Sequence, residues 1–423
     1  MSSTRHVERR LVAVAADRIA EEPVVALQGP RAVGKSTLVR ELAEAAGADV
    51  VDLDDLPTRA AVNADPTLFA AAPAPVFIDE FQHVPEILDA IKAQLNRDLR
   101  PGRFILTGST RYDSLPLAAQ SLTGRLHLLT VWPFSQGEID GRREVFAEQL
   151  MEDPLTLVST QRSQTPRAQY IDRVVAGGFP IPLSRATATA RGRWYDDYVQ
   201  LVIDRDVVEL SRIQQRQQLP PLFARLAGQT GQVLNVTSAA SGVNMKTSTA
   251  ENYLKLLEAV FLLYRLPAWG TTLRRRAVLS PKLHVLDSGL AAHLLGVSAA
   301  KLARLDATSL SEFGHLLETF CVGEIRKQLS WQQERFEVGH WRTHDDQEVD
   351  LVIERRDGTV AGVEVKAGTS VAGSDFRGLR ALRDTLGDAF IGGVVLCLGE
   401  RSYTYDDRLH VLPVDRLWTP AIA

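Results

Sequence analysis

Residues 24–37 have the sequence VVALQGPRAVGKST, and this stretch decides the fold of the first third of the chain. An apolar run leads into a loop that matches the pattern G-x-x-x-x-G-K-[ST], and the loop leads into a helix-forming segment. In such a strand, loop and helix, backbone N–H groups turn toward a phosphate and the helix N-terminus adds the positive end of its dipole. The pattern therefore predicts a site for a nucleoside triphosphate, formed by Gly29, Pro30, Arg31, Ala32, Val33, Gly34, Lys35, Ser36 and Thr37.

An acidic stretch follows at residues 76–80, VFIDE, where an apolar run ends in two carboxylates. Together with the loop, it predicts that the protein hydrolyses ATP, with Mg²⁺ as the second cofactor. Lys35 is expected to reach the β- and γ-phosphates, and Ser36 to ligate Mg²⁺. Asp79 is expected to hold the same ion through water, and Glu80 to orient or deprotonate the attacking water.

Two further residues follow in the order expected beside such a site. Thr107 lies in the next apolar run, FILTGS, and Arg125 precedes the run LHLLTVWP. This order resembles that of the AAA+ ATPases. The resemblance implies that Thr107 is a sensor residue and that Arg125 is an arginine finger for the nucleotide of a neighbouring subunit, hence a homo-oligomer such as a ring. The alternative is that Arg125 is one surface arginine among forty.

The composition limits the class of protein. A chain of 423 residues is long enough for about three domains, and 45% hydrophobic with 24% charged residues is ordinary for a globular protein. No apolar run approaches the roughly 20 residues of a membrane-spanning helix, so we expect no membrane partner. Two cysteines, Cys321 and Cys397, cannot form a disulfide framework, so a reducing cytoplasm is the expected location. The net charge of −4 does not attract nucleic acid, so any binding of nucleic acid would need a local basic patch.

The order of apolar patterns predicts an α/β fold class in four segments. Residues 1–150 alternate buried strands with helices, which indicates a parallel sheet covered on both faces. Residues 151–215 are expected to form a helical lid or linker, and residues 216–295 a winged-helix-like domain. Residues 296–423 return to strands and are expected to form a second α/β domain.

The winged-helix interpretation rests on three helical segments at residues 220–229, 236–241 and 246–264, followed by a basic hairpin at 267–287. In that arrangement the third helix would face a DNA groove and the hairpin would be the wing. The residues expected to contact DNA are Lys246, Thr247, Thr249, Arg274, Arg275, Arg276 and Lys282. Similar three-helix units also bind proteins, and a run of arginines is often only a solvated surface.

Acidic residues and a lysine converge in the last segment. Asp350 and Glu364 are equidistant from Asp357 in a predicted hairpin turn, so antiparallel pairing places them across from each other. Lys366 shares a face with Glu364, because strand side chains alternate. Glu318 on the preceding helix can add a third carboxylate.

This arrangement resembles the PD-(D/E)xK restriction-endonuclease superfamily. The resemblance implies that Glu318, Asp350 and Glu364 bind Mg²⁺ and that Lys366 helps to position or activate water against a phosphodiester. Val349 stands where the superfamily name has proline. Because that superfamily also contains inactive copies, the sequence leaves open whether this domain cleaves DNA.

The whole chain resembles a large bacterial and archaeal family of AAA-type ATPases fused to a C-terminal domain of unknown function. The shared phrases include GPRAVGKST, VFIDEFQHVP, LTGRLHLLTVWPFS, SPKLHVLDSGLAAHLLG and EVDLVIE. The resemblance implies an ATPase core, a helical or winged-helix centre and a nuclease-like C-terminal domain, without an agreed role.

Two functions are consistent with these features. The first is an ATP-driven protein that binds branched or broken DNA and remodels or processes it, with cleavage left open. The second is a nucleotide-dependent switch that binds a protein partner or regulates transcription, with an inactive nuclease-like domain. Stimulation of ATP hydrolysis by DNA distinguishes the first from the second.

Overall fold

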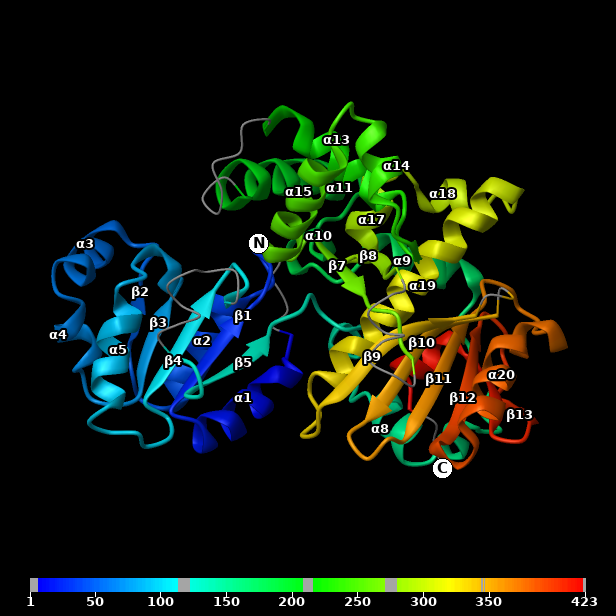
Figure 1. The fold of residues 1–423 in the computed structure, drawn as a ribbon, viewed down its shortest axis with the longest axis horizontal. Coiled ribbons are helices and arrows are strands. Elements are labelled where there is room, and N and C mark those ends of the chain that lie inside the picture. The colour runs from blue at the N-terminus through cyan, green and yellow to red at the C-terminus, as the bar shows by residue number, and fades with distance from the viewer. Residues whose placement is uncertain are drawn as a thin grey trace.

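The computed structural model describes residues 7–112, 122–207, 216–270, 280–343, 345 and 347–420. Figure 1 shows a sheet with helices at the N-terminal end of the chain (blue to cyan), a group of helices in the middle (green) and a second sheet with helices at the C-terminal end (yellow to red). The predicted fold class, α/β at both ends with a mainly helical centre, is confirmed.

The N-terminal sheet has the strand order β2-β3-β4-β1-β5, and neighbouring strands run parallel. Its strands and helices are β1 Val24–Gln28, β2 Val50–Asp52, β3 Val76–Asp79, β4 Phe104–Gly108, β5 Leu126–Thr130, α1 Arg10–Glu21, α2 Lys35–Ala45, α3 Leu56–Ala64, α4 Pro66–Ala70 and α5 Ile87–Leu95. Each predicted strand of this region is therefore present.

Both faces of this sheet are buried, as its continuous apolar strands predict. Val25 and Leu27 of β1 belong to a cluster with Leu38 of α2, whereas Val24 belongs to a cluster with Ile91 of α5. Neighbouring residues of one strand thus face opposite layers of helices, because side chains alternate along a strand. The layers leave the carboxyl ends of β1, β3 and β4 at one edge, which carries the candidate nucleotide site.

The middle of the chain consists of short helices around a small sheet with the order β6-β8-β7. The elements are α7 Gln136–Asp140, α8 Phe146–Glu152, α9 Arg167–Ala176, α10 Pro180–Leu183, α11 Ala188–Leu201, the π-helix η4 Val202–Val207, α13 Leu219–Ala227, β6 Gln232–Val233, α14 Val236–Ser241, α15 Thr247–Ala259, β7 Leu263–Leu266, β8 Lys282–Val285, α17 Ser288–Leu294 and α18 Ala299–Leu302.

One prediction for this region is wrong in its boundary. The helix expected over 246–264 ends at Ala259, and residues 263–266 form the strand β7 instead. Phe261 has φ of +60°, which turns the chain out of the helix before the strand begins. The expected hairpin is present, since β7 pairs antiparallel with β8, but its first strand starts four residues earlier than predicted.

The C-terminal sheet has the order β13-β14-β12-β11-β10-β9 and lies between two helices. Its elements are α19 Ala307–Leu329, β9 Phe336–Arg342, β10 Glu348–Arg355, β11 Val360–Val365, α20 Arg377–Leu386, β12 Phe390–Cys397, β13 Tyr403–Asp406 and β14 Leu409–Pro413. Leu351 and Val363 face the side of α19, and Val352 faces the side of α20 with Leu379. The sequence did not predict β13 and β14.

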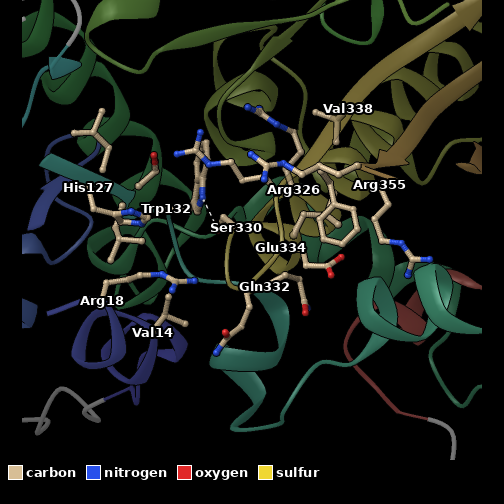
Figure 2. A pocket seen from close by; sticks show the side chains of 18 of the residues that line it. Val14, Arg18, His127, Trp132, Arg326, Ser330, Gln332, Glu334, Val338 and Arg355 are labelled. Atoms are coloured by element: carbon tan, nitrogen blue, oxygen red, sulfur yellow. Dashed lines mark hydrogen bonds between the residues drawn. The ribbon is translucent and has the colours of Figure 1, made fainter. Parts of the chain in front are cut away.

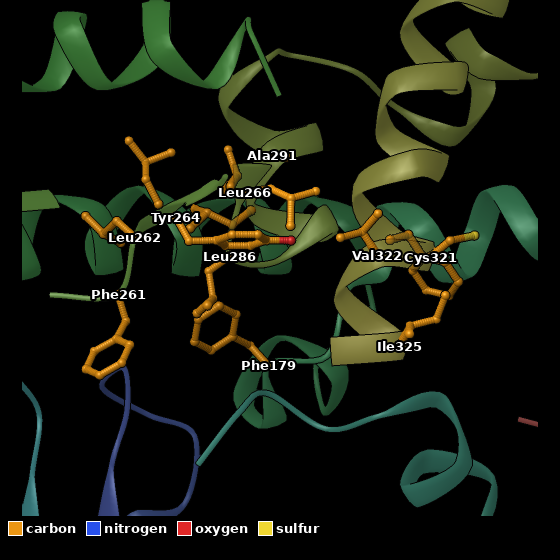
Figure 3. Close-up of a cluster of buried hydrophobic side chains, with 14 of the residues drawn as sticks. Phe179, Phe261, Leu262, Tyr264, Leu266, Leu286, Ala291, Cys321, Val322 and Ile325 are labelled. Atoms are coloured by element: carbon orange, nitrogen blue, oxygen red, sulfur yellow. The ribbon is translucent and has the colours of Figure 1, made fainter. Parts of the chain in front are cut away.

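Apolar packing joins the middle sheet to α19. Figure 3 shows Tyr264 and Leu266 of β7 in one cluster with Val322 and Ile325 of α19. On its other side α19 contacts α8, and the predicted boundary after residue 150 falls inside α8. None of the helices in the described ranges is long and apolar enough to cross a membrane.

Candidate functional site

The phosphate-binding loop has the backbone geometry that its glycines allow. Gly34 has φ of +92° and is the N-cap of α2, so the helix begins directly at Lys35. A Cβ atom on Gly29 would lie 2.3 Å from the carbonyl oxygen of Val131, so only glycine fits this close approach to the end of β5. The loop is thereby held between β1, α2 and β5, with the start of α2 directed into the site.

Lys35 is a buried cation, with only 5% of the residue exposed. Its Nζ donates hydrogen bonds to the carbonyls of Gly29 (3.1 Å) and Pro30 (3.0 Å) and lies 3.8 Å from Oε1 of Glu80. Burial lowers the pKa of Lys35, because the surroundings solvate the ammonium less well than water does. Negative phosphate oxygens would stabilise the poorly solvated ammonium group, so Lys35 is suited to bind the triphosphate that the motif predicts.

The ends of β3 and β4 bring the predicted acidic residues and the sensor together. The hydroxyl of Thr107 donates to Oδ1 of Asp79 and accepts the backbone N–H of Glu80 at 3.0 Å. Glu80 has a left-handed φ of +55° directly after β3, and its Oε1 lies 3.8 Å from Nζ of Lys35. Gln82 donates to Oε2 of Glu80 and, at 3.0 Å, to Oγ of Ser109. Sequence reasoning missed Gln82, which holds the carboxylate of Glu80 in place.

The two carboxylates differ electrostatically. Burial raises the pKa of Asp79, and hydrogen bonds from Thr107 and Ser36 counteract only part of that rise. Burial alone would also raise the pKa of Glu80, but the nearby cations Lys35 and Arg31 lower it below its usual value. Glu80 is therefore ionised at neutral pH, as a residue that attracts a proton from water must be. Asp79 and the Ser36 hydroxyl are the groups that can hold Mg²⁺ here.

Arg31 of the loop makes a contact that the sequence did not predict. Its guanidinium donates to both carboxylate oxygens of Asp206, at 2.5 Å and 2.7 Å. Asp206 is buried in the π-helix η4, so this fork-shaped ion pair joins the loop to the helices of the middle region. The sequence contains no motif around Asp206, since its role depends on the tertiary contact alone.

Arg125 lies away from the site on its own chain. It precedes β5, and β5 runs parallel to β1 with Leu126 beside Val24, so Arg125 is at the amino end of the sheet. The nucleotide site is at the opposite, carboxyl end. The guanidinium donates to Oδ1 of Asn96 at 2.7 Å. Thr37, the last residue of the predicted loop, is exposed on the first turn of α2.

The residues expected to contact DNA divide into three groups. Lys246 and Thr247 are exposed at the start of α15, and Thr249 is half-buried in its first turn. Arg274, Arg275 and Arg276 lie outside the described residues. The prediction for Lys282 is wrong: this residue is only 2% exposed and cannot face a groove. The sequence places Lys282 inside the basic hairpin at 267–287, as part of the wing, whereas its ammonium group lies among carboxylates.

The C-terminal carboxylates are as close as the sequence predicts, but each already has a cationic partner. The register that pairs Leu351 with Val363 brings Asp350 and Glu364 together at the end of the β10–β11 ladder. Lys282 contacts Glu318 and Asp350, both at 2.8 Å. Across the described ranges, no group of three or more His, Cys, Asp or Glu residues is arranged to hold a metal ion.

Lys366 forms the second ion pair of this region. Its Nζ lies 2.6 Å from Oε1 of Glu364, while Oε2 of Glu364 is buried without a hydrogen-bond partner. Burial, followed by the charge of Asp350, raises the pKa of Glu364 to about 8. At the expected Mg²⁺ site, ammonium groups therefore occupy one oxygen each of Glu318, Asp350 and Glu364, and Oε2 of Glu364 is the oxygen left without a partner.

A basic cleft of about 810 Å³ lies between the N-terminal sheet and the C-terminal sheet. Figure 2 shows Arg18 and His127 on one side and Arg355 on the other. Arg335 and Arg356 also line it and are exposed. Sequence reasoning missed this cleft because its arginines are far apart in the chain.

Comparison with known families supports the nucleotide site. Residues 21–140 match the model of an AAA domain, and residues 167–301 and 313–417 match two models described as domains of unknown function, DUF8612 and DUF4143. Residues 21–140 are thus a P-loop ATPase domain of the AAA kind, as the loop and the acidic strand predict.

Similar proteins cover nearly the whole chain. Uncharacterized proteins of Mycobacterium tuberculosis and Mycobacterium bovis are each 26% identical over 416 residues, which is 98% of this chain and 85% of theirs. Among solved structures, a Walker-type ATPase of Pyrococcus abyssi is 14% identical, with 69% of this chain and 97% of that chain covered and a TM-score of 0.38. The RuvB Holliday junction branch migration motor of Thermotoga maritima is 18% identical, with 61% and 87% covered and a TM-score of 0.28.

Proposed function

We propose that this protein hydrolyses ATP and uses the hydrolysis to remodel DNA bound by its middle region. The observation that carries the proposal is the contact of Arg111 with α15. Arg111 follows β4, the strand that ends beside the nucleotide site, and its backbone N–H donates to the carbonyl of Ala259 at 2.9 Å. Its Nε donates to the carbonyl of Glu258 at 2.8 Å, and its guanidinium lies 4.9 Å from the ring centroid of Phe261.

This contact connects the site to the surface expected to bind DNA. Ala259 is the last residue of α15, and Lys246 and Thr247 are exposed at its start. A helix of 13 residues is about 20 Å long. If Arg111 moves when the γ-phosphate is lost, α15 would move with it as one rigid helix, and its exposed end would be displaced. The pair of Arg31 and Asp206 makes a second connection from the loop to the middle helices.

Hydrolysis would use the residues at the edge of the sheet. Lys35 binds the phosphates and Glu80, ionised and held by Gln82, orients the attacking water and accepts its proton. Thr107, on the neighbouring strand, contacts the carboxylate of Asp79 and the backbone N–H of Glu80. When bound, Mg²⁺ held by Ser36 and Asp79 supplies positive charge to the phosphate oxygens.

Two features support DNA as the partner. The order α13, β6, α14, α15, β7, β8 is the order of elements expected for a winged helix, with α15 as the helix that enters a groove. The basic cleft, with the exposed Arg335 and Arg356, offers a second surface for phosphates. Cleavage is not part of this proposal, because Lys282 and Lys366 occupy the carboxylates of the C-terminal domain.

A second candidate is a nucleotide-dependent switch that binds a protein partner. The ion pairs of Lys282 favour it, because carboxylates paired with a lysine are not free to hold a metal ion, and a domain that does not cleave DNA can still bind a protein. Its ATP hydrolysis would be indifferent to DNA.

Replacement of Lys35 by alanine is expected to weaken ATP binding about 10- to 100-fold, the loss of a charged hydrogen bond of about 1.5–3 kcal/mol. Titration with a fluorescent ATP analogue measures this. The control is Lys92→Ala, which removes an exposed lysine of α5 and is expected to bind as the unaltered protein does. Equal affinity of the Lys35→Ala protein would contradict the site.

The Glu80→Gln protein is expected to bind ATP and to hydrolyse it at least about 100-fold more slowly, because the amide cannot accept the proton of the attacking water. Phosphate release under saturating ATP measures the rate. Glu86→Gln, an exposed residue six positions later, is the matched control. Normal turnover in the Glu80→Gln protein would remove this residue from the mechanism.

DNA is expected to stimulate the ATPase several-fold when duplex, single-stranded, forked and four-way-junction DNA are compared. Lys246→Ala should weaken DNA binding and reduce the slope of log affinity against log salt concentration by about 1. The control is Lys255→Ala, which removes an exposed lysine further along α15 and should change neither the affinity nor the slope. A rate unchanged by every DNA at low and moderate salt would favour the protein-binding switch.

Arg125→Ala is expected to abolish hydrolysis if Arg125 completes the site of a neighbouring subunit. Mixing this protein with the Glu80→Gln protein should then restore part of the activity, because some sites combine an intact Glu80 with an intact Arg125. Arg97→Ala, an exposed arginine nearby, is the control. Full activity of the Arg125→Ala protein would show that the guanidinium serves only its bond to Asn96.

A further inference from the structure

The ammonium group of Lys282 lies at the centre of a buried cluster of carboxylates. Its Nζ is 2.8 Å from Oε1 of Glu318, 2.8 Å from Oδ1 of Asp350 and 2.6 Å from Oε1 of Glu348. The lysine comes from β8 of the middle sheet, whereas Glu318 comes from α19, and Glu348 and Asp350 come from one face of β10. The cluster is therefore built by two regions of the chain.

Each N–H donor of the Lys282 ammonium group has a carboxylate oxygen as its acceptor. An ammonium group has three N–H donors, and three carboxylate oxygens surround this one. The other oxygen of Asp350, Oδ2, accepts the backbone N–H of Val365 at 2.9 Å. The distances of 2.6–2.8 Å between Nζ and the carboxylate oxygens are those of charged hydrogen bonds.

The charges also favour a permanently protonated lysine. Burial would lower the pKa of Lys282, but Asp350, Glu318 and Glu348 together raise it above its usual value. The lysine is 2% exposed, so water contributes little to its solvation. The carboxylates therefore replace water as the ligands of this cation.

A second set of contacts fixes the backbone beside the cluster. Ala268 forms a parallel bridge with His340 of β9, and the N–H of Trp269 donates to the carbonyl of His340 at 2.6 Å. The N–H of His340 donates in turn to the carbonyl of Pro267 at 2.9 Å. These bonds extend β7 toward the C-terminal sheet, so β7 and its partner β8 are both attached to that domain.

We propose that Lys282 is the built-in counter-ion of the C-terminal carboxylate cluster, standing where a divalent metal ion was expected and fastening the middle sheet to α19 and β10. The cluster of Lys282, Glu318, Glu348 and Asp350 is called the lysine lock below. The lock makes the middle and C-terminal regions one body and leaves Asp350 without a free oxygen for a metal ion.

The first test counts Mn²⁺ ions bound to the nucleotide-free full chain by electron paramagnetic resonance. The unaltered protein and the Asp350→Asn protein are expected to bind the same number, because Asp350 holds no ion. Asparagine keeps the shape of the side chain, and circular dichroism confirms that the variant is folded. One ion more on the unaltered protein would overturn the proposal.

The second test measures the apparent melting temperature of Lys282→Met, which keeps the length of the side chain and removes its charge. We expect a fall of roughly 5–15 °C, since three carboxylates lose their buried partner. The double variant Lys282→Met/Asp350→Asn is expected to melt higher than Lys282→Met alone, because one uncompensated charge is removed.

The matched control is Lys301→Met. Lys301 pairs with Glu312 at 2.7 Å, but both side chains are about one-third exposed, so the expected change is about 2 °C or less. A melting temperature of Lys282→Met as high as that of the control would overturn the lock. If Lys282→Met yields no folded protein, the Mn²⁺ count on the unaltered and Asp350→Asn proteins decides the proposal.

Discussion

A buried ammonium group needs oxygen atoms around it, and the arrangement of this protein depends on that requirement. The chain has eight lysines, and among the described residues Lys35, Lys282 and Lys327 are buried. Lys35 is surrounded by two loop carbonyls and Glu80, and Lys282 by three carboxylates. Lys327 donates to Glu324 at 2.6 Å and to the carbonyl of Phe134 at 2.9 Å. Each of these cations therefore fixes elements that are distant in sequence.

Helix α19 carries much of this arrangement, because its polar side chains are buried and find partners in other regions. Glu318 is bound to Lys282 of the middle sheet, and Glu324 accepts the backbone N–H of Gln136 at 2.8 Å. Gln328 accepts the N–H of Ala147 at 3.1 Å and donates to the carbonyl of Leu417 at 2.7 Å. Removing any one partner would leave a buried polar group unsatisfied, so these hydrogen bonds favour the observed packing of the helix over others.

Patterns of neighbouring residues in the sequence predicted the strands and the hairpin, because these elements depend on residues close together in the chain. Continuous apolar runs located β1, β3 and β4, and the spacing around Asp357 brought Asp350 opposite Glu364. The role of Lys282 depends instead on carboxylates 36 and 68 positions away in the sequence, and no local pattern contains that information. The pairing of Arg31 with Asp206, 175 positions later, was hidden for the same reason. The strands β13 and β14 are short and separated by a polar turn. Each is therefore too short to show a clear alternation of apolar and polar residues.

These contacts join the middle region to both ends of the chain. The middle region is fastened to the C-terminal sheet by the lysine lock, by the bridge at His340 and by the apolar cluster around Tyr264. Its polar links to the nucleotide site include Arg31 with Asp206, Arg205 with Asp54 and His83, and Arg111 with the end of α15. Arg31 and Arg111 belong to the segments that follow β1 and β4, at the edge of the sheet that carries the nucleotide site. A change of nucleotide would act first on these links, because they lie beside the site, whereas Phe134 and Gln136 attach the same domain to buried side chains of α19.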